Sequence, residues 1–124
     1  MSCSSIVEIE AVLTAYIDGL YHADPHRLAQ VFHPQAVYAT ADEATPLILD
    51  VPAYLDVVRQ RVPPSACGED PTFATEAIHL AGQNTASVRL RCSLNGRNYI
   101  DFLSLIKVEG KWLIISKVFH FTET

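Results

Sequence analysis

The sequence predicts an α+β domain: a cone-shaped roll in which three N-terminal helices pack in the concave face of a strongly curved, mostly antiparallel sheet. The first half of the 124-residue chain carries three amphipathic helical patterns, and residues 72–121 carry four strand patterns separated by short turns. Helices followed by consecutive strands are typical of this fold class, and a chain of this length forms one domain, residues 1–124. A sheet that curls around helices encloses a cavity, so we expect function to depend on the residues that line it.

Composition argues against several function classes. The net charge is −5 without any cluster of Lys or Arg, which argues against a nucleic-acid partner. No apolar run approaches the ~20 residues of a membrane span, and the N-terminus resembles no signal peptide, so we expect no membrane contact and a cytoplasmic location. The chain has no dinucleotide or phosphate-binding fingerprint, and its histidines and cysteines lack metal-ligand spacing. We therefore expect no cofactor and no metal.

Capping and proline signals mark the helices. The first is expected to begin at the capping box Ser5-Ile6-Val7-Glu8, the second at Asp24-Pro25 and the third at Pro52. The second should end at His33-Pro34 and the third at Pro63-Pro64, with Tyr54, Leu55, Val58 and Val62 on its apolar face. Strands are expected at residues 35–40, 72–81, 84–94, 97–107 and 111–121.

The segment Leu94-Asn95-Gly96-Arg97 is the strongest local signal in the chain. Asn-Gly between two alternating runs predicts a two-residue type I′ turn, which fixes the register of the hairpin. Leu94 then opposes Arg97, and Leu90 opposes Asp101. The apolar face of this hairpin should meet the helices; it carries Ala86, Val88, Leu90, Cys92 and Leu94.

The opposite face of the same hairpin mixes charged and apolar side chains. Arg89 lies opposite Phe102 there, and Arg91 lies opposite Ile100. Exposed apolar area interleaved with charge is typical of a surface that associates with a second copy of itself. We expect a homodimer through this outer face of the sheet, with Arg89, Arg91, Ile100 and Phe102 at or near the contact.

Asp101 is unusual because the register puts a carboxylate on the apolar face. An unpaired charge there is costly. Asp101 either lies near the end of the sheet, solvated or paired with Arg97 or Lys117, or it faces a ligand. A three-residue loop at 108–110 would place Lys117 opposite Asp101 and turn Leu113, Ile115, Lys117, Phe119 and Phe121 inward. A two-residue loop would instead turn Trp112, Ile114, Ser116, Val118 and His120 inward.

Three tyrosines add to the expected interior. Tyr16 falls on the buried face of the first helix, and Tyr38 and Tyr54 can join it from neighbouring elements. Buried phenols need hydrogen-bond partners, so a cavity with water or a ligand suits several of them together, although each also fits an ordinary core position.

The whole chain resembles the nuclear-transport-factor-2-like (NTF2-like) superfamily, also called SnoaL-like, which has a cystatin-like cone. The segments Tyr16–Asp24 and Val31–Val37, with Leu28 between them, follow the pattern "Y..g...gD...l...fhpdA.v", and Gly110–Ile114 followed by Val118-Phe119-His120 is a second familiar element. Within the superfamily the chain looks most like the putative lumazine-binding group. The resemblance implies the fold and a sheet-to-sheet dimer, whereas the same cone hosts isomerases, cyclases, dehydratases and binding-only domains.

The ketosteroid-isomerase branch offers a residue-level comparison. That branch combines a helix tyrosine and a protonated strand aspartic acid as donors with an aspartate base. Tyr16 matches the tyrosine, the base position falls at Thr40, and the second donor falls at Leu105, or at Asp101 in a shifted alignment. Because threonine cannot take a proton from carbon at neutral pH, steroid-isomerase chemistry is disfavoured.

We therefore expect a domain that binds an unidentified apolar or aromatic small molecule in its cone, without an assignable catalytic residue. An enzyme of the polyketide-cyclase, dehydratase or isomerase type, using Asp101 or Asp42 with Tyr16, is the alternative, and a dimeric interaction domain without a ligand is the second. The expected ligand-binding residues are Tyr16, Leu20, Phe32, Tyr38, Thr40, Tyr54, Tyr99, Asp101, Lys117 and Phe119.

Overall fold

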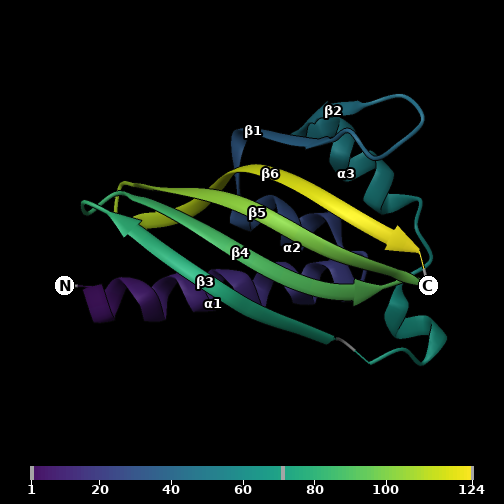
Figure 1. Cartoon of the computed structure of the whole chain (residues 1–124), viewed down its shortest axis with the longest axis horizontal. Helices are drawn as coiled ribbons and strands as arrows, with labels where there is room; N and C mark the ends of the chain where they lie inside the picture. The colour runs from purple at the N-terminus through teal and green to yellow at the C-terminus, as the bar shows by residue number, and fades with distance from the viewer. Residues whose placement is uncertain (1, 71, 124) are drawn as a thin grey trace.

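A six-stranded sheet covers three helices (Figure 1). The computed structural model describes residues 2–70 and 72–123. Within these residues the helices are α1 (Ser2–Tyr21), α2 (Pro25–Val31) and α3 (Val51–Arg59), with a short 3-10 helix, η1 (Pro64–Cys67). The strands are β1 (Phe32–Thr40), β2 (Leu47–Asp50), β3 (Thr72–Ala81), β4 (Thr85–Leu94), β5 (Arg97–Val108) and β6 (Lys111–Glu123).

The sheet runs in the order β2-β1-β6-β5-β4-β3. Only β1 and β6 pair in parallel among the described strands, and every other neighbouring pair is antiparallel. The helices lie on one side of this curved sheet in Figure 1, with α1 crossing behind β3 and β4. The predicted α+β cone is confirmed.

The β4–β5 hairpin has the predicted register. Leu94 pairs with Arg97 and Leu90 pairs with Asp101. Asn95 and Gly96 adopt positive φ angles of 55° and 75°, as a type I′ turn requires. The alternating burial of β4 places the apolar face against the helices, with Leu90 fully buried.

The β5–β6 hairpin combines the two alternatives that the sequence leaves open. Its turn has two residues, Glu109 and Gly110, because Val108 pairs with Lys111. A β-bulge then shifts the register, so that Leu105 pairs with Ile114 whereas Ser104 pairs with Ser116. The bulge reverses which side chains of β6 point inward. Trp112 and Ile114 are buried before the bulge, and Lys117 and Phe119 are buried after it.

Because of this bulge, the predicted pairing of Asp101 with Lys117 is wrong. Asp101 lies opposite Phe119, and Lys117 lies opposite Leu103. Both side chains still point into the cone, with exposed fractions of 0% for Asp101 and 4% for Lys117. The alternative with a three-residue loop predicts the correct face for Lys117. It pairs Lys117 with Asp101, however, two residues before the observed partner Leu103.

Two of the three predicted helix starts need small corrections. The Asp24 side chain caps α2 as expected and accepts hydrogen bonds from the backbone N–H groups of His26 (3.0 Å) and Arg27 (3.3 Å). Helix α1 starts at Ser2, so the predicted capping box at Ser5 lies inside the helix. Helix α3 starts at Val51 under an Asp50 cap and ends before Val62, which is exposed rather than on the buried face.

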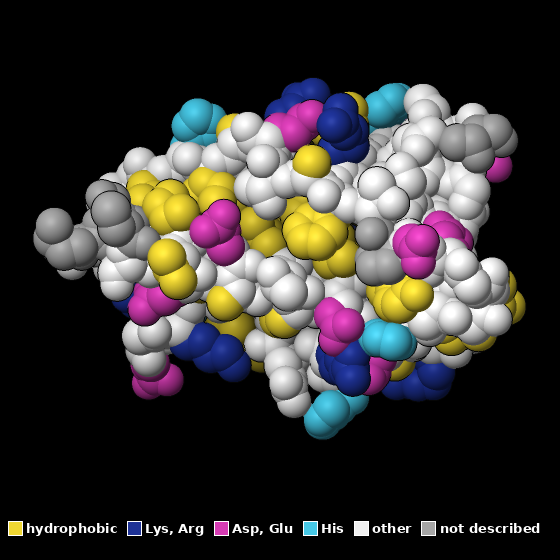
Figure 2. Space-filling model, turned by 90° about the horizontal axis from the view of Figure 1, so that it is seen from below, with side chains coloured by type: hydrophobic (Ala, Val, Ile, Leu, Met, Phe, Trp, Pro, Cys, Tyr) yellow, Lys and Arg dark blue, Asp and Glu magenta, His cyan; other side chains and the backbone are white. Residues whose placement is uncertain are grey.

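The core lies between the helices and the concave face of the sheet. Helices α1 and α2 approach closely at Gly19, where a Cβ would lie 2.8 Å from the Leu28 Cδ2. The edge strand β3 is less covered, since its side chains are exposed or half-buried. Figure 2 views the molecule from below and shows hydrophobic side chains at the surface along the band between this edge and α1. Strand β2, which pairs with β1 at the other edge, was not predicted from the sequence.

Candidate functional site

A buried tyrosine and a buried carboxylate meet inside the cone. The Tyr16 hydroxyl, on the inner face of α1, donates a 2.6 Å hydrogen bond to Oδ2 of Asp101 on β5. Both residues have an exposed fraction of 0%. Asp101 is therefore neither solvated nor paired with Arg97, whose guanidinium lies 3.8 Å from Glu43 instead.

The environment keeps the Tyr16 phenol protonated. Burial raises the pKa of Tyr16 well above its ordinary value, and the negative charge of Asp101 raises it further. Tyr16 thus acts as a hydrogen-bond donor to the carboxylate. The other carboxylate oxygen of Asp101, Oδ1, is buried and has no hydrogen-bond partner in the described structure.

Lys117 occupies a cage of aromatic rings beside this pair. Its Nζ lies 5.1–6.0 Å from five ring centroids, a range in which a cation is attracted to the ring face. None of the ion pairs among the described residues involves Lys117. The five rings belong to Tyr16, Tyr38, Tyr54, Tyr99 and Phe119.

Lys117 is charged at neutral pH in spite of its burial. Burial lowers the pKa of Lys117, but negative charge at Tyr54 and Asp101 raises it more strongly, so that the pKa lies above its ordinary value. Because Tyr54 is neutral at pH 7, Asp101 is the group that stabilises the ammonium at that pH. The cone therefore holds one buried cation and one buried carboxylate that do not form a close ion pair.

The aromatic rings pack on one another as well as on the lysine. Tyr38 and Tyr54 stack with centroids 4.3 Å apart, and Phe32 meets the edges of Tyr54 at 5.5 Å and Tyr16 at 6.0 Å. Burial raises the pKa of Tyr54, whose hydroxyl has no hydrogen-bond partner in the described part of the chain. Tyr54 is therefore, after Asp101, a second residue of the cone with an unsatisfied buried polar atom.

A narrow cavity leads from the surface to Lys117. Its volume, the mouth included, is about 350 Å³, but its interior is so narrow that it holds roughly one water. A wider vestibule lies outside it, with a volume of about 730 Å³, the mouth included. It shares Arg61, Asn95 and Tyr99 with the cavity and is also lined by Val62, Arg97 and Glu123. The cavity is lined by Leu20, Tyr38, Arg61, Cys92, Leu94, Asn95, Tyr99 and Lys117.

The residues expected at the site fall into four groups. Leu20, Tyr38, Tyr99 and Lys117 line the cavity, whereas Tyr16, Tyr54, Asp101 and Phe119 surround Lys117 or Tyr16 from behind. Phe32 lies one layer deeper, against Tyr16 and Tyr54. Thr40 is buried but does not line the cavity; its Oγ1 accepts a hydrogen bond from the backbone N–H of Asp42 (3.1 Å).

Four residues of the cavity wall are missing from the sequence-based set. Cys92 and Leu94 lie on the strand face that the alternation already directs inward, so that pattern was sufficient to include them. Asn95 belongs to the hairpin turn, and Arg61 follows the end of α3. No local pattern marks Arg61, because only the packing of α3 against the sheet brings it to the mouth.

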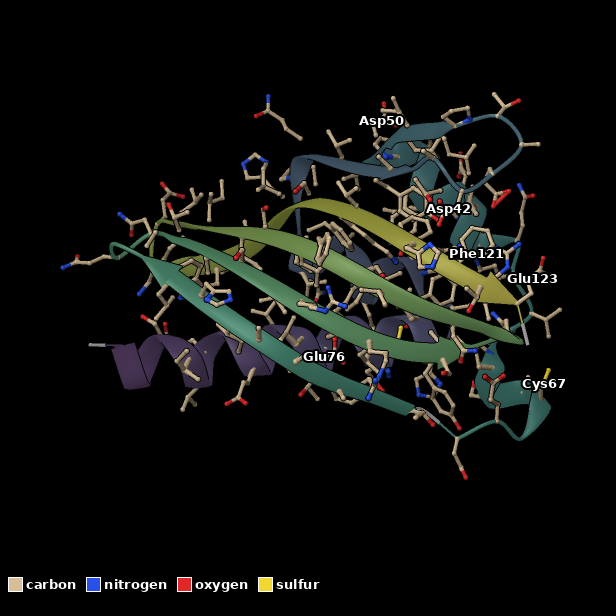
Figure 3. All side chains as sticks on the ribbon, viewed as in Figure 1. Asp42, Asp50, Cys67, Glu76, Phe121 and Glu123 are labelled. Atoms are coloured by element: carbon tan, nitrogen blue, oxygen red, sulfur yellow. The ribbon has the colours of Figure 1, made fainter. Side chains whose placement is uncertain are left out.

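Asp42 does not reach the interior. Its Oδ2 accepts a hydrogen bond from the backbone N–H of Phe121 (3.2 Å) and contacts Nδ1 of His120, which is exposed on the outer face. Figure 3 shows Asp42 beside Phe121 at the end of β6. Asp42 is therefore not an acid or base of the cone, which removes it from the enzymatic alternative. The described residues contain no cluster of His, Cys, Asp and Glu that fits a metal ion.

Comparison with solved structures identifies the fold. An NTF2-like protein of unknown function from Shewanella baltica is 27% identical, with a TM-score of 0.89 over 100% of this chain and 98% of that one. One from Silicibacter pomeroyi is 22% identical, with a TM-score of 0.86 over 98% and 99%. A ketosteroid isomerase-like protein from Erwinia carotovora atroseptica is 14% identical, with a TM-score of 0.73 over 95% and 96%. No helix in the described residues is long and apolar enough to cross a membrane.

Sequence comparison adds a short match and a family match. A segment of 38 residues is 45% identical to the protein named aldolase FrzH from Cladobotryum sp., but it spans only 29% of this chain and 30% of that protein. The family described as "Putative lumazine-binding" matches residues 4–120, nearly the whole chain. The chain therefore belongs to this family and has the NTF2-like fold.

Proposed function

We propose that this domain binds a small, flat, largely apolar molecule at the mouth and interior of its cone. The observation that carries the proposal is the Lys117 ammonium, which is buried in five aromatic rings at the wall of a cavity that opens to the surface. Burial of an ammonium costs desolvation energy even where Asp101 and the rings offset it, so a lysine at this wall calls for a reason other than packing. Recognition of a bound molecule is such a reason, since apolar pockets with a few polar groups are typical ligand sites.

The narrow interior of the cavity restricts how a ligand would enter. The innermost space accommodates about one water, so the body of a ligand would occupy the vestibule and insert one edge towards Lys117. Arg61 and Tyr99 stand between the two spaces and are only half-buried. Rotation of these two side chains is therefore the movement that admits a planar ring.

Titration with planar aromatic compounds tests this proposal. Native mass spectrometry and calorimetry should detect a saturable 1:1 complex with wild-type protein. Tyr99→Ala should lower the affinity at least fivefold, because it removes ring contacts at the mouth. Tyr21→Ala is the matched control, since Tyr21 is also half-buried but does not line the cavity. Absence of binding, or equal effects of the two variants, would contradict the proposal.

A second candidate function is acid–base catalysis on a carbonyl compound. It is favoured by one observation: Asp101 has a buried oxygen without a partner among the described residues, and its charge acts on the buried Lys117 ammonium. Once a substrate has displaced the wall in front of Asp101, the carboxylate would take a proton from the carbon beside a carbonyl. The C–H electron pair would form a carbon–carbon double bond, and the π pair of the carbonyl would move to its oxygen, which Lys117 would stabilise as an enolate. Tyr16 would orient Asp101 rather than touch the substrate. FrzH, the short sequence match, is named an aldolase.

Deuterium exchange tests this second candidate without knowledge of the product. In D2O, an enzyme of this kind would exchange the α-protons of a planar aryl ketone faster than buffer does, as NMR detects. Asp101→Asn should abolish the acceleration. If wild-type protein and Asp101→Asn leave the exchange rate equal to that of buffer, the domain does not catalyse this step on such ketones.

We also propose that two copies of the chain associate through the outer face of the sheet. Phe102 and Val118 are 54% and 48% exposed and line a groove of about 410 Å³. Arg89 packs over the Phe102 ring at 5.4 Å. Arg89 and Arg91 already contact Glu76 of the same chain, so the contact between copies would depend mainly on apolar burial rather than on new ion pairs. Ile100 and His120 complete the rim of this groove.

A further inference from the structure

We infer that the ligand of this cavity is a planar organic anion, whose charged end lies between the Lys117 ammonium and the Arg61 guanidinium. This inference rests on the small-molecule binding proposed above and adds the chemical class of the ligand. It follows from the balance of charges around the cavity, from the groups that already satisfy those charges, and from the shape of the space between them.

The lining of the cavity is positively charged. Lys117 and Arg61 are its only ionised side chains among the described residues, and no carboxylate lines it. Asp101 lies behind the wall, where it accepts the hydrogen bond of Tyr16. The vestibule adds one cation and one carboxylate, Arg97 and Glu123. Three cations against Asp101 and Glu123 leave an excess positive charge, which an anion would neutralise.

Arg61 contacts phenol groups rather than a carboxylate. Its guanidinium lies near the phenols of Tyr54, Tyr38 and Tyr99 and donates a hydrogen bond to that of Tyr38. It forms none of the ion pairs found among the described residues. The neighbouring Arg97 differs, because it faces Glu43 at 3.8 Å and stacks on the Phe121 ring at 4.1 Å. Arg61, rather than Arg97, is therefore the guanidinium available to a ligand in the vestibule.

The walls restrict the anion to a flat molecule with few charges. Leu20, Leu94 and Cys92 contribute apolar surface, and the thiol is inert because burial raises the pKa of Cys92 to about 12. Tyr38, which stacks on Tyr54 behind it, and Tyr99 contribute aromatic rings to the lining. A compact polyanion such as free phosphate would leave this apolar surface unused, whereas an aromatic carboxylate or an ionised heteroaromatic ring would contact both the cations and the rings.

Three probes that share a naphthalene ring and differ in charge test the inference: 2-naphthoate, 2-naphthamide and 2-naphthylmethylammonium. Calorimetry should show 2-naphthoate binding at least tenfold more tightly than 2-naphthamide, with the cation weakest. Arg61→Gln should remove most of this preference. Arg59→Gln is the matched control, because Arg59 lies two residues away and pairs with the exposed Asp56. Lys117→Met should also lower the affinity for 2-naphthoate more than that for 2-naphthamide.

The outcomes separate this inference from the proposed function. Equal affinities for 2-naphthoate and 2-naphthamide would contradict the inference that the ligand is an anion, but not the proposal that the domain binds a small molecule. If 2-naphthylmethylammonium bound most tightly of the three probes, that result would also contradict an anionic ligand. Absence of binding by all three probes would contradict small-molecule binding itself and the inference with it. Because Arg61 is half-buried at the surface, Arg61→Gln gives a result even if Lys117→Met fails to fold.

Discussion

Tyr16 and Asp101, 85 residues apart in the sequence, are joined by a 2.6 Å hydrogen bond inside the cone. The bond links α1 to β5 and satisfies one oxygen of a carboxylate that has no access to solvent. Hydrogen bonds to charged groups are stronger than those between neutral groups, and a buried charge depends on them. The pair therefore stabilises the fold and also fixes the charge beside Lys117.

Replacement of Tyr16 by phenylalanine should destabilise the protein. Tyr16→Phe keeps the ring in the core but leaves both oxygens of Asp101 without a partner, and such a loss costs about 1–3 kcal/mol of unfolding free energy. Urea unfolding monitored by circular dichroism measures it. Tyr21→Phe, at a half-buried tyrosine outside the aromatic cluster, should change the free energy little. Similar losses in both variants would show that Tyr16 has no special role.

The stability of the fold should decrease in alkaline solution. Burial raises the pKa values of Tyr16, Tyr54 and Cys92 in the folded chain, and the pKa of Lys117 is also raised. Each group thus keeps its proton in the folded state at a pH where the unfolded chain loses it. Stability is fully present below the ordinary pKa values, which begin at 9.0 for cysteine, and is lost as the pH rises above them.

A single substitution isolates one part of this pH dependence. Each group contributes a slope of up to about 1.4 kcal/mol per pH unit well above the pKa of the unfolded chain, which is 10.0 for tyrosine, so Tyr54→Phe should reduce the loss between pH 10 and pH 11 by about 1 kcal/mol. Urea unfolding at pH 8, 9, 10 and 11 measures the slopes. An unfolding free energy that stays constant or rises over this range would contradict the assignment of raised pKa values.

The two described cysteines should differ sharply in reactivity. Cys67 is exposed in η1, whereas Cys92 is buried and its pKa is raised to about 12. Because the thiolate is the reactive form, a thiol reagent at pH 8 should modify Cys67 rapidly and Cys92 only after unfolding. A Cys3→Ser background restricts the assay to these two residues. Rapid modification of Cys92 in folded protein would indicate that the cavity wall opens to solvent.

The outer face of the sheet provides a test of assembly. Phe102→Glu places a charge at the centre of the exposed apolar groove, so the proposed dimer should dissociate to monomers at micromolar concentration. Light scattering on both proteins gives the masses. Val7→Glu is a suitable control, because Val7 is 65% exposed on α1, away from this groove. A monomeric wild type, or a Phe102→Glu dimer as tight as the parent, would show that this face does not associate.

The sequence predicted the parts of the fold that depend on local chemistry. Asn95-Gly96 fixes its hairpin because few residues adopt two successive positive φ angles, and that register places Asp101 correctly on the inner face. Asp24-Pro25 likewise specifies the start of α2. In these places one short segment contains all the information that determines its structure.

Features that depend on tertiary packing were not predictable in the same way. The bulge in β6 is the clearest case, because both faces of that strand are apolar and the alternation favours neither. Strand β2 has four residues and takes its structure from pairing with β1. The cage around Lys117 gathers rings from α1, β1, α3, β5 and β6, so no single segment reveals it.

NMR of the lysine side chains tests the central claim, ligand binding beside Lys117, most directly. The chain has three lysines, and Lys117 is the one inside the aromatic cage, so ring currents should shift its ε-CH2 signal upfield of those of Lys107 and Lys111. In protein labelled with ¹³Cε-lysine, saturating 2-naphthoate should move the Lys117 signal and leave the other two in place. A Lys117 signal that stays unchanged at millimolar ligand, or movement of Lys107 or Lys111 alone, would contradict a ligand site in the cone.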